Sequence, residues 1–323
     1  MVRDDERHSD LLLQNTVTTY QAYNNWGGLS LYSHPQRAYR VSFNRPYRSS
    51  AGAGFFFAWE YPMLRFLERE GYDVSYSTDI DTHSRDDLLL HHKALIVVGH
   101  DEYWSWEMRD HFEAARDAGV NLGFFSANNS YWQVRFEPSE LTGDLNRTMI
   151  CYKNKSLDPY YSDGISSHRR LVTVQFRDPI VDRPEERMVG VMFDSETLGS
   201  RDIVISDAAN WMFNGTGIAN GAHLKGLLGY EADRTCGWAP PQIAVVARSP
   251  YTVPGRTHYA EMATYQTGAG STVVATGTMQ WSWGLDNIAY EGSKDFHNPL
   301  AQQVTRNILA RLIRGPAASQ RQP

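Results

Sequence analysis

Residues 94–107 constrain the fold of this chain more than any other stretch, and they read Ala-Leu-Ile-Val-Val-Gly-His-Asp-Glu-Tyr-Trp-Ser-Trp-Glu. The unbroken apolar run at 94–98, ended by Gly99, is typical of a strand buried on both faces of a parallel sheet. His100, Asp101 and Glu102 follow where the chain leaves this strand, and open α/β sheets bind ligands outside the carboxyl ends of their strands. The stretch therefore predicts a site. The alternative is that the carboxylates only favour the N-terminus of a helix capped by Ser105.

Strand and helix patterns alternate around this stretch. The expected strands are 10–14, 72–78, 94–98 and 120–125, and the expected helices are 59–70, which ends at Gly71, and a second one running to Ala118. This order predicts a doubly wound, mostly parallel α/β sheet. Further strands are expected at 171–176, 243–247, 258–265 and 271–276, followed by a last helix that carries Val304, Ile308, Leu309 and Leu312. We expect one domain over 1–323, with loop and β insertions at roughly 140–240.

Residues 18–28 have neither a helical nor a strand period, and they are rich in side chains that can bind ligands, including Tyr20 and Tyr23. A polar, aromatic loop after a core strand indicates a functional segment. Asn128 follows the strand at 120–125 in the same way. Because the carboxyl ends of parallel strands meet at one edge of a sheet, these polar groups should converge.

Composition narrows the classes of function. The net charge of -6, with acids and bases interspersed, argues against nucleic-acid binding. Two cysteines, Cys151 and Cys236, exclude a disulfide scaffold and a zinc ribbon and leave their own roles open. No signal-peptide pattern or membrane-length apolar run is present, so we expect a cytoplasmic protein. The 12% aromatic content fits an aromatic-lined cavity or an interface, or simply a filled core.

Several catalytic motifs are missing: the Gly-x-Ser-x-Gly elbow, His-Glu-x-x-His, the Walker A loop and the dinucleotide fingerprint. Covalent catalysis is therefore not expected. The available donors are hard oxygens, namely the phenols of Tyr20 and Tyr23 and the carboxylates of Glu102 and Glu231. These suit ferric iron better than zinc or Cu(I), and such an ion polarises a carbonyl group or acidifies a bound water.

The segments that carry this chemistry resemble the C-terminal domain of the N,N-dimethylformamidase large (beta) subunit family. The matching segments are Thr19–Gly28, Gly99–Trp104, Phe125–Asn129 with Tyr131 and Trp132, Gly229–Glu231, and Gln280–Gly284. The resemblance implies an amidotransferase-like (flavodoxin-like) α/β fold that hydrolyses a small formamide at a mononuclear iron held by two tyrosinates and one glutamate. It also implies a small-subunit partner and assembly into oligomers.

Carried onto this chain, the resemblance makes Glu102 the glutamate ligand and Tyr23 one tyrosine ligand, with Tyr20 as its competitor. His100 would hold the metal-bound water or the substrate. Asn128 could donate to the developing oxyanion, and Glu231 would be the general base or proton shuttle.

The family's other tyrosine ligand lies upstream of residues 20–23, as does a β-rich region, and neither is in the sequence given. Either the chain is a piece of a longer one, or Tyr20 or Tyr61 replaces the ligand, or iron is not bound in this way. A binding module without catalysis, with a small polar or sugar-like ligand in the same cavity, is the rival interpretation. A structural domain that lacks its N-terminal half is the third.

Overall fold

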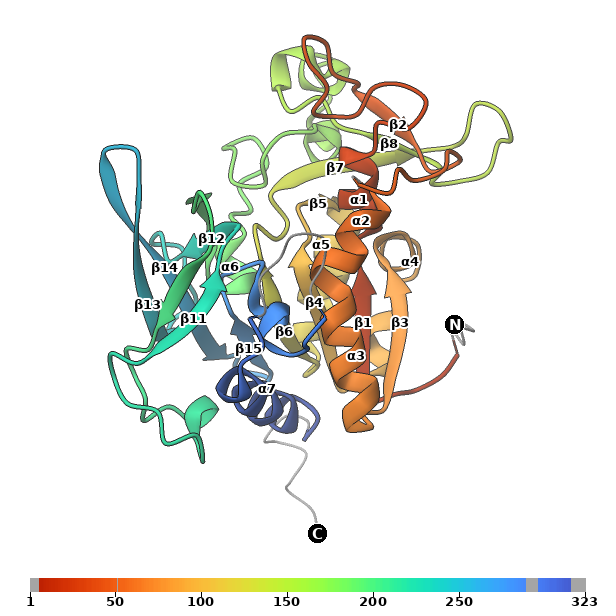
Figure 1. Ribbon diagram of the computed structural model, residues 1–323. Coiled ribbons are helices and arrows are strands. Elements are labelled where there is room, and N and C mark those ends of the chain that lie inside the picture. Colours follow the sequence, from red (N-terminus) through yellow and green to blue (C-terminus); the bar gives the residue numbers. More distant parts are fainter. Residues whose placement is uncertain (1–5, 51, 289–295, 315–323) are drawn as a thin grey trace.

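The computed structural model describes residues 6–50, 52–288 and 296–314. At its centre is a seven-stranded sheet with the order β13-β14-β15-β6-β4-β1-β3 (Figure 1). The five strands from β15 to β3 are parallel, whereas β14 and β13 are antiparallel to their neighbours. In sheet order the bounds are Ala244–Val253, Arg256–Gln266, Thr272–Ala275, Asn121–Ala127, Ala94–His100, Leu11–Asn15 and Val74–Thr78. The fold is mixed α/β with a sheet rich in parallel strands.

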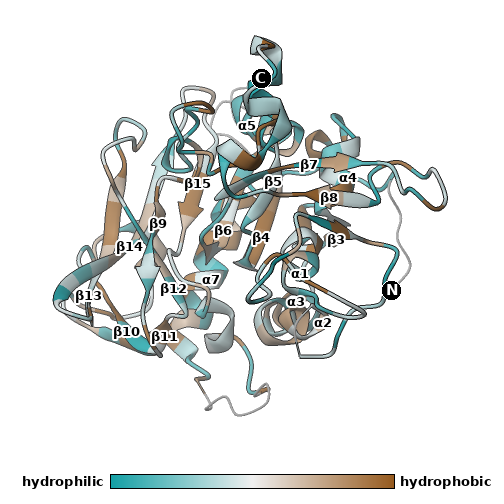
Figure 2. Cartoon of the chain, turned by 90° about the horizontal axis from the view of Figure 1, so that it is seen from above, coloured by the Kyte–Doolittle hydropathy of each residue, from teal (hydrophilic) through white to brown (hydrophobic). Residues whose placement is uncertain are grey.

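Helices cover both faces of this sheet (Figure 2). Side chains alternate along each strand, so Leu11 and Leu13 pack into one core while Leu12 packs into the other. The first core contains α3 (Tyr61–Glu70) and α7 (Pro299–Leu312), and the second contains α5 (Trp106–Asp117). Since β4 and β6 lie between the two cores, every residue of both strands is buried, as the apolar runs predicted.

The helix ends follow local signals in the sequence. Ser105 caps α5 by accepting a hydrogen bond from the Met108 amide at 3.1 Å, as predicted. Asn298 caps α7 in the same way, with Pro299 at the first helical position. Gly71 ends α3 with φ of +75°, where a residue without Cβ is least strained.

Two expectations about local structure were wrong. Residues 18–28 do not form a loop throughout, because α1 (Val17–Tyr23) is a helix. Its polar side chains have buried partners, such as the Asp79 carboxylate, which accepts from the Thr18 amide and hydroxyl at 2.8 and 2.7 Å. Residues 171–176 do not form a strand: a 3-10 helix ends at Leu171, and a single isolated bridge joins Gln175 to Trp132. That apolar run reflects burial, not sheet pairing.

Smaller sheets lie beyond the carboxyl ends of the parallel strands and beside β13, where an isolated bridge joins Ala247 to Ile205 (Figure 1). One has the order β2-β8-β7-β5, and two pairs are β12 with β9 and β10 with β11. Their bounds are β2 Arg40–Ser42, β5 Tyr103–Ser105, β7 Trp132–Glu137, β8 Thr148–Ile150, β9 Met192–Glu196, β10 Arg201–Val204, β11 His223–Leu228 and β12 Glu231–Arg234. The short helices are α2 Ala53–Phe55, the π-helix Phe56–Glu60, α4 Asp79–Ser84 and α6 Glu186–Val189. Much of the segment 140–240 forms these smaller sheets and the loops between them.

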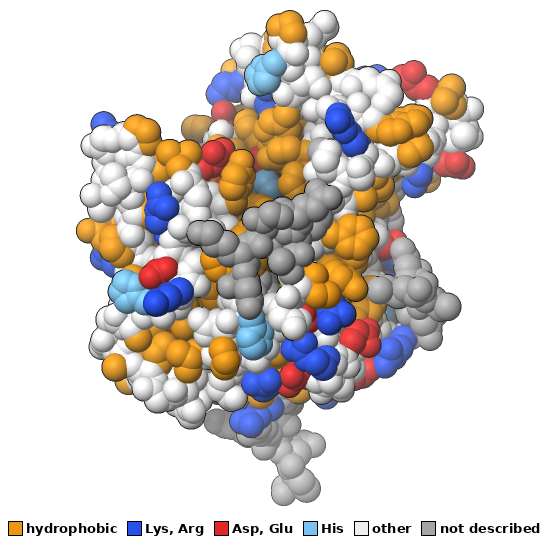
Figure 3. Space-filling view, in the orientation of Figure 1, with side chains coloured by type: hydrophobic (Ala, Val, Ile, Leu, Met, Phe, Trp, Pro, Cys, Tyr) orange, Lys and Arg blue, Asp and Glu red, His pale blue; other side chains and the backbone are white. Residues whose placement is uncertain are grey.

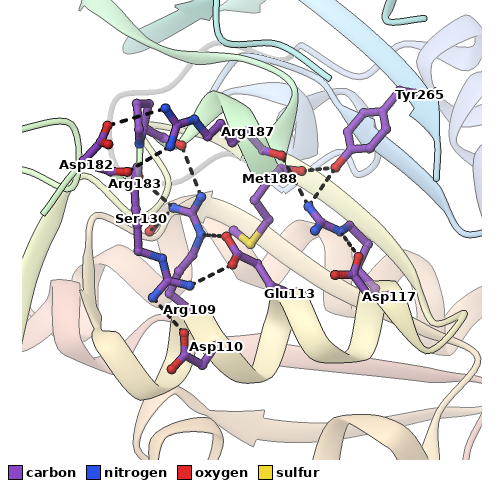
Figure 4. A network of polar contacts seen from close by, with 12 residues as sticks. Arg109, Asp110, Glu113, Asp117, Ser130, Asp182, Arg183, Arg187, Met188 and Tyr265 are labelled. Atoms are coloured by element: carbon purple, nitrogen blue, oxygen red, sulfur yellow. Dashed lines mark hydrogen bonds and ion pairs between the residues drawn. The ribbon is translucent and has the colours of Figure 1, made fainter. Parts of the chain in front are cut away.

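A network of arginines and carboxylates ties α5 to this inserted segment (Figure 4). Arg109 is fully buried and contacts Glu113 at 2.6 Å and the Pro184 carbonyl at 3.1 Å. Arg183 reaches the same Glu113 at 2.7 Å and also Asp110 at 2.7 Å. A buried guanidinium is stable only when it is paired and hydrogen-bonded, so these contacts fix the segment against the sheet.

No helix in the described part of the chain is long and apolar enough to cross a membrane.

Candidate active site

The carboxyl ends of β4, β6 and the start of β12 bring together charged groups that are far apart in sequence. His100 is the last residue of β4, and Glu231 is the first of β12. The Nε2 atom of His100 lies 3.0 Å from Glu231 Oε2 and 3.5 Å from Glu102 Oε2, and all three side chains are buried. One ring nitrogen of His100 therefore faces both carboxylates.

Two tyrosines also contact Glu102. Tyr23, at the end of α1, donates its hydroxyl to Glu102 Oε2 at 3.2 Å. Tyr32 donates to both carboxylate oxygens, at 2.8 and 2.9 Å, and accepts from the Tyr103 hydroxyl at 2.6 Å. The Thr19 hydroxyl accepts from the Glu102 amide at 3.0 Å, which holds the backbone of the carboxylate in place. One carboxylate and two phenol oxygens thus meet at one point.

The structure places Tyr20 and Tyr61 elsewhere. The Tyr20 hydroxyl donates to Glu60, which also accepts from the Thr16 amide at 3.2 Å. Tyr61 begins α3 and lies against the rings of Phe56 and Phe57. Neither tyrosine joins the phenols around Glu102.

Asn128 and Asp233 add further polar groups next to this cluster. Asn128 follows β6 in the left-handed region, with φ of +54°, and its amide donates to Asp233 Oδ1 at 2.9 Å. Asn128 Oδ1, Asn129 Nδ2 and Asp233 Oδ2 are buried without a hydrogen-bond partner among the described residues. Because buried polar atoms are normally paired, orphaned atoms gathered in one place are typical of a site that binds a polar ligand.

Burial and neighbouring charge shift the acid–base behaviour of this cluster. Burial lowers the pKa of His100, but Glu231 and Glu102 outweigh it and raise that pKa to about 9. Burial raises the pKa of Glu102 and, together with the charge of Glu102, raises the pKa values of Tyr23 and Tyr32 well above 10. The raised pKa favours the imidazolium form of His100 at neutral pH, with its Nε2 atom facing both carboxylates.

A metal at this point would need tyrosine oxygens. Across the described residues, no group of three or more His, Cys, Asp and Glu side chains is arranged to hold a metal ion. Glu102, Tyr23 and Tyr32 nevertheless supply three convergent oxygen donors, and phenolate with carboxylate suits a hard trivalent cation. The chemistry of the donor set therefore fits ferric iron, with Tyr32 in the position expected of Tyr20.

Pattern analysis of the sequence missed three residues: Tyr32, Lys153 and Asp233. Asp233 lies two residues after Glu231 on β12, and this strand spacing could have identified it. Tyr32 lies in an irregular segment after Gly27 and Gly28, and Lys153 follows β8. No local signal marks either of these two, because only the fold brings them to Glu102.

The face of the molecule above the parallel strands is hollowed (Figure 3). The recess lies between the lobe of β9–β14 on the left and the segment around β2, β7 and β8 on the right, and hydrophobic side chains and a histidine are visible in it. An apolar recess with a few convergent polar groups is the usual form of a small-molecule site.

Comparisons with known proteins identify the family of this chain. The family model described as "N,N-dimethylformamidase beta subunit-like, C-terminal" matches residues 1–297. The N,N-dimethylformamidase beta subunit of Alcaligenes sp. is 26% identical over 144 residues, which cover 41% of this chain and 19% of that protein. The chain thus aligns with about a fifth of the length of this curated relative.

Two solved structures show distant likeness. A cytoplasmic protein from Salmonella typhimurium has a TM-score of 0.40 at 11% identity, with 77% of this chain and 85% of that chain covered. A ThuA-like protein from Bacteroides uniformis has a TM-score of 0.39 at 7% identity, with 78% and 81% covered. The family model, which covers most of the chain, decides the relationship: this protein belongs to the N,N-dimethylformamidase beta subunit-like C-terminal family.

Proposed function

We propose that this chain hydrolyses a small amide, with water as the nucleophile and without a covalent intermediate. The observation that carries the proposal is the convergence of Glu102, His100 and Glu231 with two tyrosine hydroxyls, at distances of 2.8–3.5 Å. Membership of the dimethylformamidase-related family and the name of the Alcaligenes relative support a formamide as the substrate class.

Proton transfer falls to the pair formed by Glu231 and His100. The Nε2 atom of His100 lies 3.0 Å from Glu231 Oε2, so the charge of the imidazolium holds the carboxylate beside it. Glu231 then takes a proton from the attacking water and delivers it to the leaving nitrogen, the usual work of a general base and acid. Asn128, at the neighbouring strand end, supplies a polar side chain for the oxygen that becomes negative in the transition state.

Glu102, Tyr23 and Tyr32 would hold ferric iron. Bound there, such an ion supplies Lewis acidity, which polarises the amide carbonyl and favours ionisation of water. The three side chains are buried or half-buried and already converge, so little reorganisation is needed to bind a cation.

The test uses purified protein and N,N-dimethylformamide, formamide and acetamide, with release of the amine or ammonia as the readout. Glu231→Gln should lower turnover at least about 100-fold, the usual contribution of a general base. Glu196→Gln is the matched control, because Glu196 pairs with Glu231 in the β9–β12 register but is exposed, and it should keep wild-type turnover. Failure of the wild type to release amine or ammonia from all three amides, with and without added iron, would refute the proposed hydrolase.

Iron is tested separately by elemental analysis and the visible spectrum. We expect near-stoichiometric iron and a tyrosinate charge-transfer band that Tyr23→Phe weakens. Tyr20→Phe is the control for a tyrosine on the same helix whose hydroxyl faces Glu60, and it should leave the band unchanged. A colourless wild type that takes up no iron would rule out the metal assignment, and amide release without iron would leave hydrolysis standing.

The relative's name, a beta subunit, supports a partner for this chain. We extend the proposal to assembly with a small subunit or a second copy. Light scattering of the chain alone, and after mixing with the small subunit, tests both possibilities. A monomer that binds no small subunit would contradict the extension.

A further inference from the structure

Lys153 has unusual surroundings for a lysine. It follows β8 with φ of +55°, in the left-handed region that residues with a side chain seldom adopt. Its Nζ atom lies 3.4 Å from the centroid of the Tyr32 ring, 5.1 Å from that of Tyr103 and 5.2 Å from that of Trp132. Among the described residues the ammonium has no hydrogen bond and no ion pair, so its close partners are aromatic faces.

The ammonium and Tyr23 hold the Tyr32 ring between them. The Tyr23 and Tyr32 rings are stacked, with centroids 4.1 Å apart and planes 18° apart. An ammonium 3.4 Å from the same centroid must lie over a face of the ring, and a stacked ring already covers the other face. Tyr32 is thus sandwiched between Lys153 and Tyr23, with its hydroxyl directed at Glu102.

We propose that Lys153 is a positioning residue, whose ammonium fixes the Tyr32 ring against Glu102 and Tyr23 and lowers the energy of its π electrons. This inference rests on the proposed function, in which Tyr32 is an oxygen donor to iron. A cation over an aromatic face is attracted to the electron density of the ring. The positive charge stabilises the filled orbitals of the donor, so moving an electron from the ring to a ferric ion requires more energy.

The test compares the visible spectra of the ferric protein in the wild type, Lys153→Met, Lys153→Arg and Lys155→Met. The charge-transfer maximum should move to longer wavelength in Lys153→Met, stay close to the wild type in Lys153→Arg, and remain unchanged in Lys155→Met. Lys155 is the matched control, since it lies two residues away, over Tyr161 at 5.8 Å, and contacts Asp178 at 3.3 Å. If Lys153→Met does not fold, the neutral Lys153→Gln carries the same comparison.

The outcomes separate this inference from the function on which it rests. A wild-type band that is unchanged in both Lys153→Met and Lys153→Gln, with iron fully bound, would overturn the role of Lys153 and leave the iron site intact. A shift of the same size in Lys155→Met would show a general effect of charge and would also overturn it. A wild type without iron or colour would refute the metal site, and the role of Lys153 with it.

Discussion

Replacing Asp233 with Asn should make the folded protein more stable than the wild type in alkaline solution, although the replaced side chain is almost fully buried. Burial, together with the nearby charge of Glu231, raises the pKa of Asp233 from 3.8 to about 7, against the hydrogen bond from the Asn128 amide. Asp233 Oδ2 has no partner among the described residues, so the ionised form is poorly solvated.

The sign follows from proton linkage. A folded-state pKa above the unfolded value means that the folded protein binds this proton more tightly. The contribution of Asp233 to stability is therefore most favourable below about pH 4 and is lost as the pH rises through 7. With 1.36 kcal/mol per pKa unit, ionisable Asp233 costs the folded state about 2 kcal/mol at pH 5 and about 4 kcal/mol at pH 8.5. Asn cannot ionise, but its buried amide donors cost about 1–3 kcal/mol. The variant should therefore match the wild type near pH 5 and exceed it by about 2 kcal/mol at pH 8.5.

Urea unfolding of metal-free protein, followed by tryptophan fluorescence at pH 5, 7 and 8.5, measures this difference. Glu261→Gln is the control, because the carboxylate of Glu261 accepts from the Thr235 amide and hydroxyl at 2.9 and 2.6 Å. It should lose stability without an alkaline gain. An equal loss for Asp233→Asn at every pH would show that the carboxylate is ionised and well solvated in the folded state, contrary to the reasoning.

Other consequences of the structure can be measured in the same unfolding assay. Gly99→Ala should lower the free energy of unfolding by about 3 kcal/mol, because φ is +76° and a Cβ would lie 2.4 Å from Trp59 Cβ. Gly71→Ala, where φ is +75° but no atom lies near the added Cβ, should lower it by about 1 kcal/mol. Equal costs would contradict the steric argument. Arg109→Met should cost about 2 kcal/mol at pH 7, because Glu113 loses one of its two guanidinium partners and keeps Arg183. Arg187→Met, at an exposed pair, should cost at most about 1 kcal/mol. Burial raises the pKa of Glu113, but pairing with the two arginines outweighs burial and lowers it. The stability lost in Arg109→Met should therefore shrink as the pH falls below about 4. A loss that is constant with pH would argue against the ion pair.

Much of the fold was visible in the sequence because it depends on local signals. The apolar runs at 94–98 and 120–125 predicted the central strands, and Ser105 and Gly71 marked helix ends. The polar groups after these strands were expected to converge, and His100, Glu102 and Asn128 do lie at adjacent strand ends. The prediction failed at 18–28 and at 171–176, where buried tertiary contacts, and not periodicity, decide the local conformation.

The sequence by itself determined the mixed α/β architecture, the strand ends that carry chemistry and the family, since apolar period, capping residues and motif order are properties of neighbouring residues. Only the tertiary structure decided that Tyr32 contacts Glu102 and that the ammonium of Lys153 lies over the Tyr32 ring. Tyr32 and Lys153 lie 70 and 51 residues from Glu102 along the chain, in irregular segments. Their positions follow from the packing of α1, β5 and β8 against one another, and no local pattern encodes such packing.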